Sequence, residues 1–189
     1  MTDVTDLTTS QSEIRRRVAA IGAQQWDLPT PCSNWNVRDL VIHMIEGSRM
    51  SLALLHGASA QESRAVFGVD HGPDLPAEMD VAMADELAAF EVPGAFDRIV
   101  HHPAAGDVPG MTLYQFRTAD YLLHSWDVAR ATEGDEGWHE GLVVTVWDGL
   151  QPMAPFIADI GVFGSGPSGT VDEGAPLQLR LLDLTGRRP

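Results

Sequence analysis

One long helical segment constrains this chain more than any other part of its sequence. Residues 111–130, MTLYQFRTADYLLHSWDVAR, contain neither proline nor glycine. Their apolar side chains recur at spacings of three, four and five, which fits one face of a helix better than the alternation of a strand. Asp120 and His124 lie four residues apart in this segment, so a helix presents both side chains on one face. Such a pair is compatible with two metal ligands and equally with a plain hydrogen-bonded pair.

The flanking sequence predicts further helices. Ser10 and Glu13 match a capping box for a first helix that ends near Gly22, and Asn36 with Asp39 can cap a second. The other expected elements are the body of that second helix over 37–55, a connector over 57–76, a helix over 77–91, a short extended segment over 96–101, a loop over 103–110, a helix over 142–150 and a closing helix from 177 to about 186. This pattern favours an all-α fold, an antiparallel helix bundle.

Composition excludes several classes of function. The chain has 27 acidic and 12 basic residues, a formal net charge of −15, and the acidic residues are spread along its length. Nucleic-acid binding depends on clustered Lys and Arg, so we expect no nucleic-acid partner. No stretch approaches the roughly 18 consecutive apolar residues of a membrane span, and the N-terminus does not resemble a secretory signal. Cys32 is the single cysteine, which excludes an internal disulfide and favours the cytoplasm.

Four further positions carry reactive side chains. His43 lies in the apolar run of the second helix, where a hydrogen-bonded core histidine is the simplest interpretation. Cys32 precedes a helix N-terminus that can lower a thiol pKa, but a nucleophile needs a base that the sequence does not place, so a small packing residue is favoured. His101 and His102 are neighbours near a loop; surface histidines are favoured, and one of them approaching a site is the alternative.

Two segments together resemble a known family. PTPCSNWNVRDLVIHM, which contains His43, and RTADYLLHSWDVARAT, which contains Asp120 and His124, resemble the mycothiol-dependent maleylpyruvate isomerase N-terminal family of the DinB-like (YfiT-like) superfamily. The tail APLQLRLLDLTGRRP resembles a subgroup known as metal-binding proteins. The resemblance implies an antiparallel four-helix bundle with short extra helices and an irregular C-terminal tail. It divides the chain into a metal-binding bundle over 1–155 and an extension over 156–189 that packs on it.

The resemblance also implies a divalent metal held by His43, Asp120 and His124. Characterised isomerases carry glutamate, and other members histidine, where this chain has the shorter Asp120. Two imidazoles and a carboxylate suit zinc first, with nickel or iron(II) as alternatives. Three protein ligands leave one position open, as in catalytic zinc sites. The implied cosubstrate is a small thiol such as mycothiol, bound to the metal as thiolate and added to an electrophilic carbon of a small substrate.

Residues around these ligands have two interpretations each. Arg117 shares the helix face of Asp120 and His124, and it either anchors an anionic group of the thiol or substrate or forms a structural ion pair with Asp120. Trp35 either lines the cleft or fills the core. Asp127 can orient an imidazole, although a surface pair with Arg130 is favoured.

The sequence thus favours a metal-dependent thiol transferase or isomerase. The alternatives are a metal- or ligand-binding protein of this fold without catalytic activity and a helical interaction module without a metal. A homodimer is compatible with any of these three functions. The sequence does not identify catalytic residues.

Overall fold

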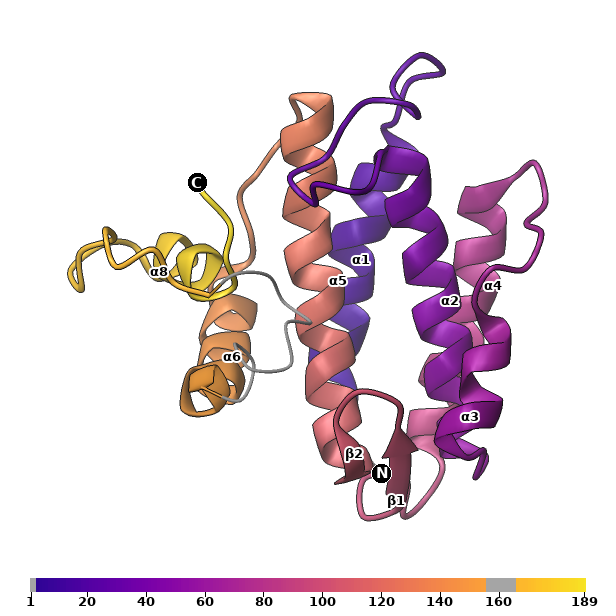
Figure 1. The fold of residues 1–189 in the computed structure, drawn as a ribbon. Coiled ribbons are helices and arrows are strands. Elements are labelled where there is room, and N and C mark those ends of the chain that lie inside the picture. Colours follow the sequence, from indigo (N-terminus) through magenta and orange to yellow (C-terminus); the bar gives the residue numbers. More distant parts are fainter. Residues whose placement is uncertain (1–2, 156–165) are drawn as a thin grey trace. The chain divides into compact units, whose positions relative to one another are not determined.

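The computed structural model describes residues 3–155 and 166–189, and the chain divides into two compact units, Met1–Glu136 and Gly137–Pro189 (Figure 1). The first unit contains α1 (Thr5–Ala19), α2 (Val37–Leu55), α3 (Ala60–Ser63), η1 (Arg64–Val66), α4 (Leu75–Glu91), β1 (Ile99–His102), β2 (Gly106–Pro109) and α5 (Gly110–Thr132). The second contains α6 (Glu140–Leu150), η2 (Gln151–Met153) and α8 (Leu177–Leu184). The predicted predominantly helical class is therefore confirmed.

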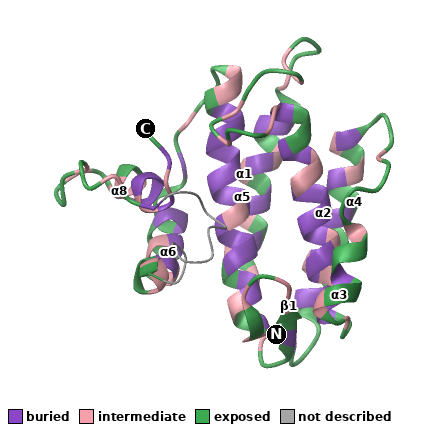
Figure 2. Cartoon of the chain, in the orientation of Figure 1, coloured by how far each residue is buried: buried purple, intermediate pink, exposed green. Residues whose placement is uncertain are grey.

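The four long helices of the first unit pack against one another. α1 lies along α5 and also contacts α4, and α2 contacts both α4 and α5 (Figure 1). Their buried faces point into a shared core (Figure 2), and each large apolar side chain buried there contributes about 1.5–3 kcal/mol. The core includes Leu7, Ile14, Leu40, Met44, Met83, Phe90, Leu113 and Tyr121.

The long α5 helix agrees with the predicted segment 111–130 and extends it at both ends. Its start is fixed by Gly110, whose N–H donates to the Arg98 carbonyl at 2.7 Å. A Cβ at Gly110 would overlap the carbonyl oxygen of Ala95, so this close backbone approach requires glycine. Its end is marked by Glu133, which takes a left-handed conformation with φ of 55°.

The two predicted helix caps had different outcomes. The capping box of α2 is confirmed: the Asn36 side chain accepts from the Asp39 N–H at 2.9 Å, and the Asp39 carboxylate accepts from the Asn36 N–H at 3.1 Å. The predicted cap at Ser10 was wrong. Ser10 lies inside α1, where its hydroxyl donates to the Leu7 carbonyl, because the helix begins earlier and buries Leu7 completely.

A small hairpin replaces part of the predicted loop. The extended segment expected at 96–101 appears as β1, and β2 pairs with it antiparallel, with Val100 opposite Val108. The prediction of a loop over 103–110 was therefore wrong for its second half. Gly106 takes a φ of 75°, which permits the tight connection between the strands.

The second unit is built from α6 and α8, which pack on each other. Leu142, Val146, Leu181 and Leu182 are buried there. The predicted boundary at residue 155 and the packing of 156–189 on the bundle stay predictions, and residues 156–165 lie outside the described part. Among the described residues, no helix is both long and apolar enough to cross a membrane.

Candidate metal centre

The three predicted metal ligands come together between α2 and α5. His43 Nε2 lies 3.6 Å from Asp120 Oδ2, and His124 Nε2 lies 3.2 Å from Asp120 Oδ1. One donor atom from each of the three residues lies within 4.8 Å of the other two. The one-turn spacing on α5 brings Asp120 and His124 together, and the packing of α2 on α5 supplies His43.

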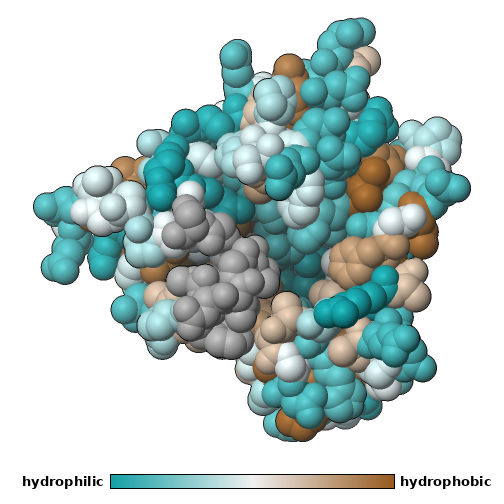
Figure 3. Space-filling view, in the orientation of Figure 1, coloured by the Kyte–Doolittle hydropathy of each residue, from teal (hydrophilic) through white to brown (hydrophobic). Residues whose placement is uncertain are grey.

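The cluster is partly exposed, chiefly at His43. A space-filling view shows a hollow with a hydrophilic floor between α5 and α2 (Figure 3). The His43 side chain is 27% exposed, whereas that of His124 is 9% exposed. Trp35, in the loop before α2, lies over both rings, with its centroid 4.5 Å from that of His43 and 5.8 Å from that of His124. A ligand can therefore approach beside His43, next to an aromatic wall.

The donor set fits a divalent metal ion. Zinc bonds to imidazole nitrogen and carboxylate oxygen at about 2.0–2.2 Å, so ligand atoms around one ion lie roughly 3–4 Å apart. The separations of 3.2 and 3.6 Å fall in this range without rearrangement of the helices. His43, Asp120 and His124 could thus hold one ion.

Charged neighbours keep Asp120 ionised. Burial by itself would raise the pKa of this carboxyl group, but the positive charges of His124, Arg117 and His43 outweigh it and hold the pKa well below its usual range. The Arg117 Nη1 donates to Asp120 Oδ2. Asp120 is thereby fixed in orientation and available as an anionic ligand at neutral pH.

Asp127 fixes the orientation of His124. It is completely buried, and its Oδ2 lies 2.8 Å from His124 Nδ1. A proton on Nδ1 leaves Nε2, the nitrogen beside Asp120, as the metal-binding atom. Burial would lower the pKa of His124, but Asp120, Asp127 and Cys32 together raise it well above its ordinary value. The surface pair expected between Asp127 and Arg130 was wrong, because Arg130 pairs with Glu136 at 2.6 Å.

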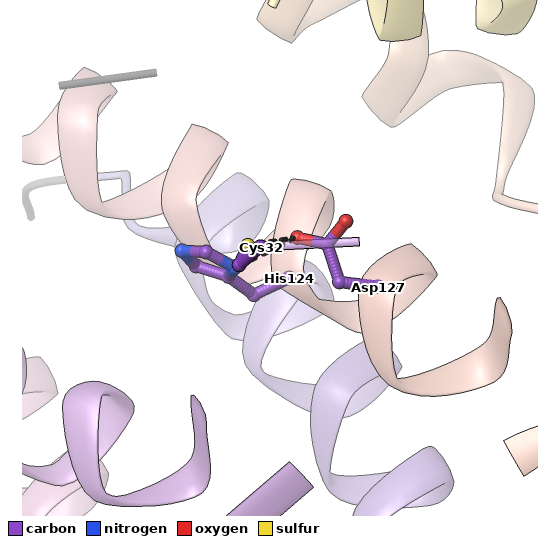
Figure 4. Close-up of side chains that lie close together, drawn as sticks. All are labelled: Cys32, His124 and Asp127. Atoms are coloured by element: carbon purple, nitrogen blue, oxygen red, sulfur yellow. Dashed lines mark hydrogen bonds and ion pairs between the residues drawn. The ribbon is translucent and has the colours of Figure 1, made fainter. Parts of the chain in front are cut away.

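Cys32 lies beside the same edge of His124. Its Sγ is 3.9 Å from His124 Nδ1 and 3.4 Å from Asp127 Oδ2 (Figure 4). The side chain is half-buried. Cys32 is therefore not only a packing residue, as the sequence favoured, but a neighbour of the candidate ligands.

Arg117 lies at the centre of a buried polar network. Its Nε donates to Glu86 at 2.9 Å, and its guanidinium lies over the ring of Tyr121. The Tyr121 hydroxyl also bonds to Glu86 and lies 2.6 Å from the Ser48 hydroxyl. Arg117 is only 4% exposed. The structural ion pair, one of the two interpretations that the sequence left open, accounts for these contacts, and a role of Arg117 in substrate binding stays a proposal.

The two neighbouring histidines of β1 occupy different environments. His101 is exposed and pairs with Asp107 at 2.6 Å. The ring of His102 lies against Phe116, with centroids 5.9 Å apart, and its Nδ1 accepts from the backbone of Ala105. Burial, reinforced by the charge of Arg117, lowers the pKa of His102. His102 is therefore a neutral, half-buried side chain rather than a surface histidine.

Comparison with known proteins identifies the family. Residues 7–129, which include α2, α4 and nearly all of α1 and α5, match the mycothiol maleylpyruvate isomerase N-terminal domain. The chain belongs to this family. His43, Asp120 and His124 all lie inside the matched region, so the resemblance read from the two sequence motifs is confirmed.

Two proteins of similar sequence and one solved structure also resemble this chain. Two uncharacterized proteins of Mycobacterium tuberculosis, from strains CDC 1551 / Oshkosh and H37Rv, are each 34% identical over 124 residues, which are 65% of this chain. The match spans 63% of the length of each relative. The crystal structure of a histidine-to-alanine mutant of mycothiol-dependent maleylpyruvate isomerase aligns with a TM-score of 0.64 at 15% identity, over 82% of this chain and 68% of that chain. This likeness shows that the two chains share a fold.

Two contributors to the site, Asp127 and Cys32, have contacts that the sequence did not favour, and a third, Glu86, was not predicted. The spacing of Asp127 from His124, three residues on a helix, carried the signal for their contact. The contact of Cys32 depends on the path of an irregular loop, for which periodicity gives no signal. Glu86 lies on α4 and reaches Arg117 only through the packing of separate helices. The one sequence signal for it is that a glutamate stands on the apolar face of the helix that contains it.

Proposed function

We propose that this protein is a metal-dependent enzyme that uses a small thiol, acting as an isomerase or transferase on a small electrophilic substrate. The convergence of His43, Asp120 and His124, with the His43 side chain partly exposed, carries the proposal. Membership of the isomerase family supports the thiol and the reaction class. The family's DinB-like four-helix bundle is part of the proposal and is supported by the mutual contacts of α1, α2, α4 and α5.

The residues present fit zinc best. His43, Asp120 and His124 would hold the ion, which supplies a positive charge that keeps a thiol sulfur deprotonated near neutral pH. Arg117 holds Asp120 in place through Oδ2, and Asp127 holds the proton of His124 on Nδ1. These two residues set which atoms face the ion before any ligand arrives.

The hollow would receive the thiol and the electrophile. Trp35, which covers the two imidazole rings, would exclude water from one side and pack against the substrate. A thiolate sulfur held beside His43 would add to an electrophilic carbon of that substrate and break its π bond. Protonation of the resulting anion would give the thioether of a transferase, whereas rotation and expulsion of the thiolate would give the isomer and return the thiol. Arg117, although buried among acidic side chains, would assist by attracting an anionic group of the thiol or substrate. A cytoplasmic location, where reduced thiols are abundant, is consistent with this chemistry.

A metal- or ligand-binding protein without catalysis is the second candidate. Asp120 favours it, because aspartate is one methylene shorter than the glutamate of characterised isomerases. A shifted ion would still bind a thiol, yet it would hold the sulfur away from the position required for turnover.

Turnover measurements separate the two candidates. Zinc-reconstituted protein would be incubated with mycothiol and a panel of electrophiles that includes maleylpyruvate, and the isomerised or sulfur-linked product would be followed. We expect turnover that the His43→Ala variant loses and the His56→Ala variant keeps, since His56 is exposed at the end of the same helix. Zinc and thiol binding without product from any electrophile would favour the binding protein.

A further inference from the structure

We propose that Cys32, His124 and Asp127 form a second metal-binding set, on the opposite nitrogen of His124 from the first. His43 and Asp120 lie near Nε2, whereas the thiol and the Asp127 carboxylate meet Nδ1 (Figure 4). The set provides sulfur, nitrogen and oxygen donors that all lie within 4.8 Å of one another. This inference goes beyond the proposed function and does not require that the protein be an enzyme.

The distances suit a tetrahedral ion. Zinc bonds to sulfur at about 2.3 Å and to nitrogen or oxygen at about 2.0–2.2 Å, so its ligand atoms lie roughly 3.3–3.6 Å apart. In this chain Cys32 Sγ is 3.4 Å from Asp127 Oδ2 and 3.9 Å from His124 Nδ1. The Nδ1–Oδ2 distance of 2.8 Å is that of a hydrogen bond. An ion would replace the shared proton, and side-chain shifts of about half an ångström would complete the coordination.

The loop before α2 already holds Cys32 in place. Its N–H donates to Thr30 Oγ1 at 3.1 Å, and its carbonyl accepts from the Trp35 N–H at 2.8 Å. Trp35 in turn packs on the ring of His124. The thiol is therefore positioned by backbone contacts on one side of His124, and it is only partly buried.

The same geometry argues against a nucleophilic cysteine. In a relay the thiol faces one ring nitrogen and the carboxylate faces the other. Here Cys32 and Asp127 both approach Nδ1, so the imidazole cannot pass a proton from the thiol and be oriented by the acid at once. Converging donors of three different types are instead typical of a metal site.

The two ligand sets share His124, so only one of them can bind an ion at a time. A neutral imidazole carries one proton, so an ion on Nε2 leaves Nδ1–H donating to Asp127, and an ion on Nδ1 leaves Nε2–H donating to Asp120. Each chain would then hold one ion in either position. Because thiolate favours soft and borderline ions, zinc and cadmium would prefer the Cys32 set more than nickel or iron(II) would.

Cobalt(II) reports the second set directly, because only thiolate coordination gives an intense sulfur-to-metal charge-transfer band in the near ultraviolet. Reduced, metal-free protein would be titrated with Co²⁺. We expect this band in the parent and a stronger one in His43→Ala, which lacks the competing set. His56→Ala, the matched control, should behave as the parent does. The absence of the band from both the parent and His43→Ala would overturn the proposal.

Two variants in the His43→Ala background assign the ligands. Cys32→Ser should abolish the band, and Asp127→Asn should weaken Co²⁺ binding by about 10–100-fold. Asp85→Asn, on the exposed face of α4, is the control for the change from Asp to Asn. Circular dichroism would verify folding. The variant of buried Asp127 could fail to fold, whereas Cys32 is half-buried and its variant should fold. The Cys32→Ser variant then tests the proposal by itself, since a charge-transfer band that survives this substitution would refute the assignment. Turnover is not measured, so failure here leaves the proposed function untouched.

Discussion

At the scale of single residues, Asp120 connects two parts of the molecule. One oxygen faces His124, and the other accepts from Arg117, which also bonds to fully buried Glu86. An isolated charge in this interior would be costly, so Arg117 is stabilised by the two acids as much as it orients them. The candidate metal centre therefore rests on a buried ion network that reaches α4.

Replacing Arg117 tests this dependence. Arg117→Met leaves Glu86 buried without its cation, so we expect a loss of about 3–5 kcal/mol of unfolding free energy in urea titrations. The double variant Arg117→Met/Glu86→Gln should recover much of the loss, because residue 86 is then uncharged and Asp120 keeps its contact with His124. A single variant as stable as the parent would contradict the network. An unchanged KM in the double variant would remove Arg117 from substrate binding.

Gly47 is the second residue on which the network depends. A Cβ at this position of α2 would lie 2.9 Å from Arg117 Cζ and closer still to Nη1. Gly47→Ala must therefore displace the guanidinium, and we expect a loss of about 1–3 kcal/mol despite the better helix propensity of alanine. Gly141→Ala is the control, since its Cβ would meet only the exposed His139 side chain. Equal unfolding free energies for the two variants would contradict the assigned contact.

The site residues differed in how far the sequence could predict them. Asp120 and His124 followed from helical spacing, and His43 joined them through the resemblance of two motifs. Asp127 carried the same type of spacing signal, but Arg130, three residues further on, offered a competing surface pair. Cys32 was unpredictable because the loop over residues 20–36 has no periodicity that would place its thiol beside His124.

At the scale of elements, hydrophobic periodicity predicted every long helix, and α2 appears with its predicted bounds. Short elements were less predictable. The β1–β2 hairpin depends on pairing between two four-residue strands, and no strong alternation marks β2. The predicted start of α1 was wrong because Ser10 resembles an N-cap. The helix instead begins before Leu7 and buries that side chain completely.

The connector between α3 and α4 offers a test at this scale. His71 lies between two acids, with Nδ1 2.9 Å from Glu78 and Nε2 3.6 Å from Glu46. Glu78 also accepts from Arg49 at 2.8 Å and from the Gly72 N–H at 3.1 Å. These contacts attach the connector to α2 and α4. Burial would raise the pKa of Glu78, but the bonds from His71, Gly72 and Arg49 outweigh it and lower the pKa.

The lowered pKa predicts a pH dependence with a defined sign. Because the folded-state pKa lies below the ordinary value of 4.5, the stabilisation by Glu78 is present above about pH 4.5 and lost as the pH falls through the folded-state pKa. We expect Glu78→Gln to reduce stability by about 1 kcal/mol at neutral pH, and the gap to close in acid. Thermal melts across pH, with exposed Glu91→Gln as control, measure this. A gap that widens in acid would contradict the assignment.

At the scale of the whole molecule, the chain combines an excess of acidic residues with a cluster of side chains that could hold a metal ion. The formal net charge of −15 favours the approach of metal ions and disfavours polyanionic partners. Family membership, the shared fold and the convergence of His43, Asp120 and His124 agree with one another. The central claim is that these three side chains hold a divalent metal.

Elemental analysis of zinc-reconstituted protein tests that claim most directly. Cys32→Ser serves as the parent because it removes the alternative thiolate set, and Cys32→Ser/His43→Ala lacks one ligand of the main site. We predict about one zinc per chain in the first protein and almost none in the second. A Cys32→Ser protein that remains folded yet retains no zinc, or a double variant that retains as much zinc as the single, would contradict the account.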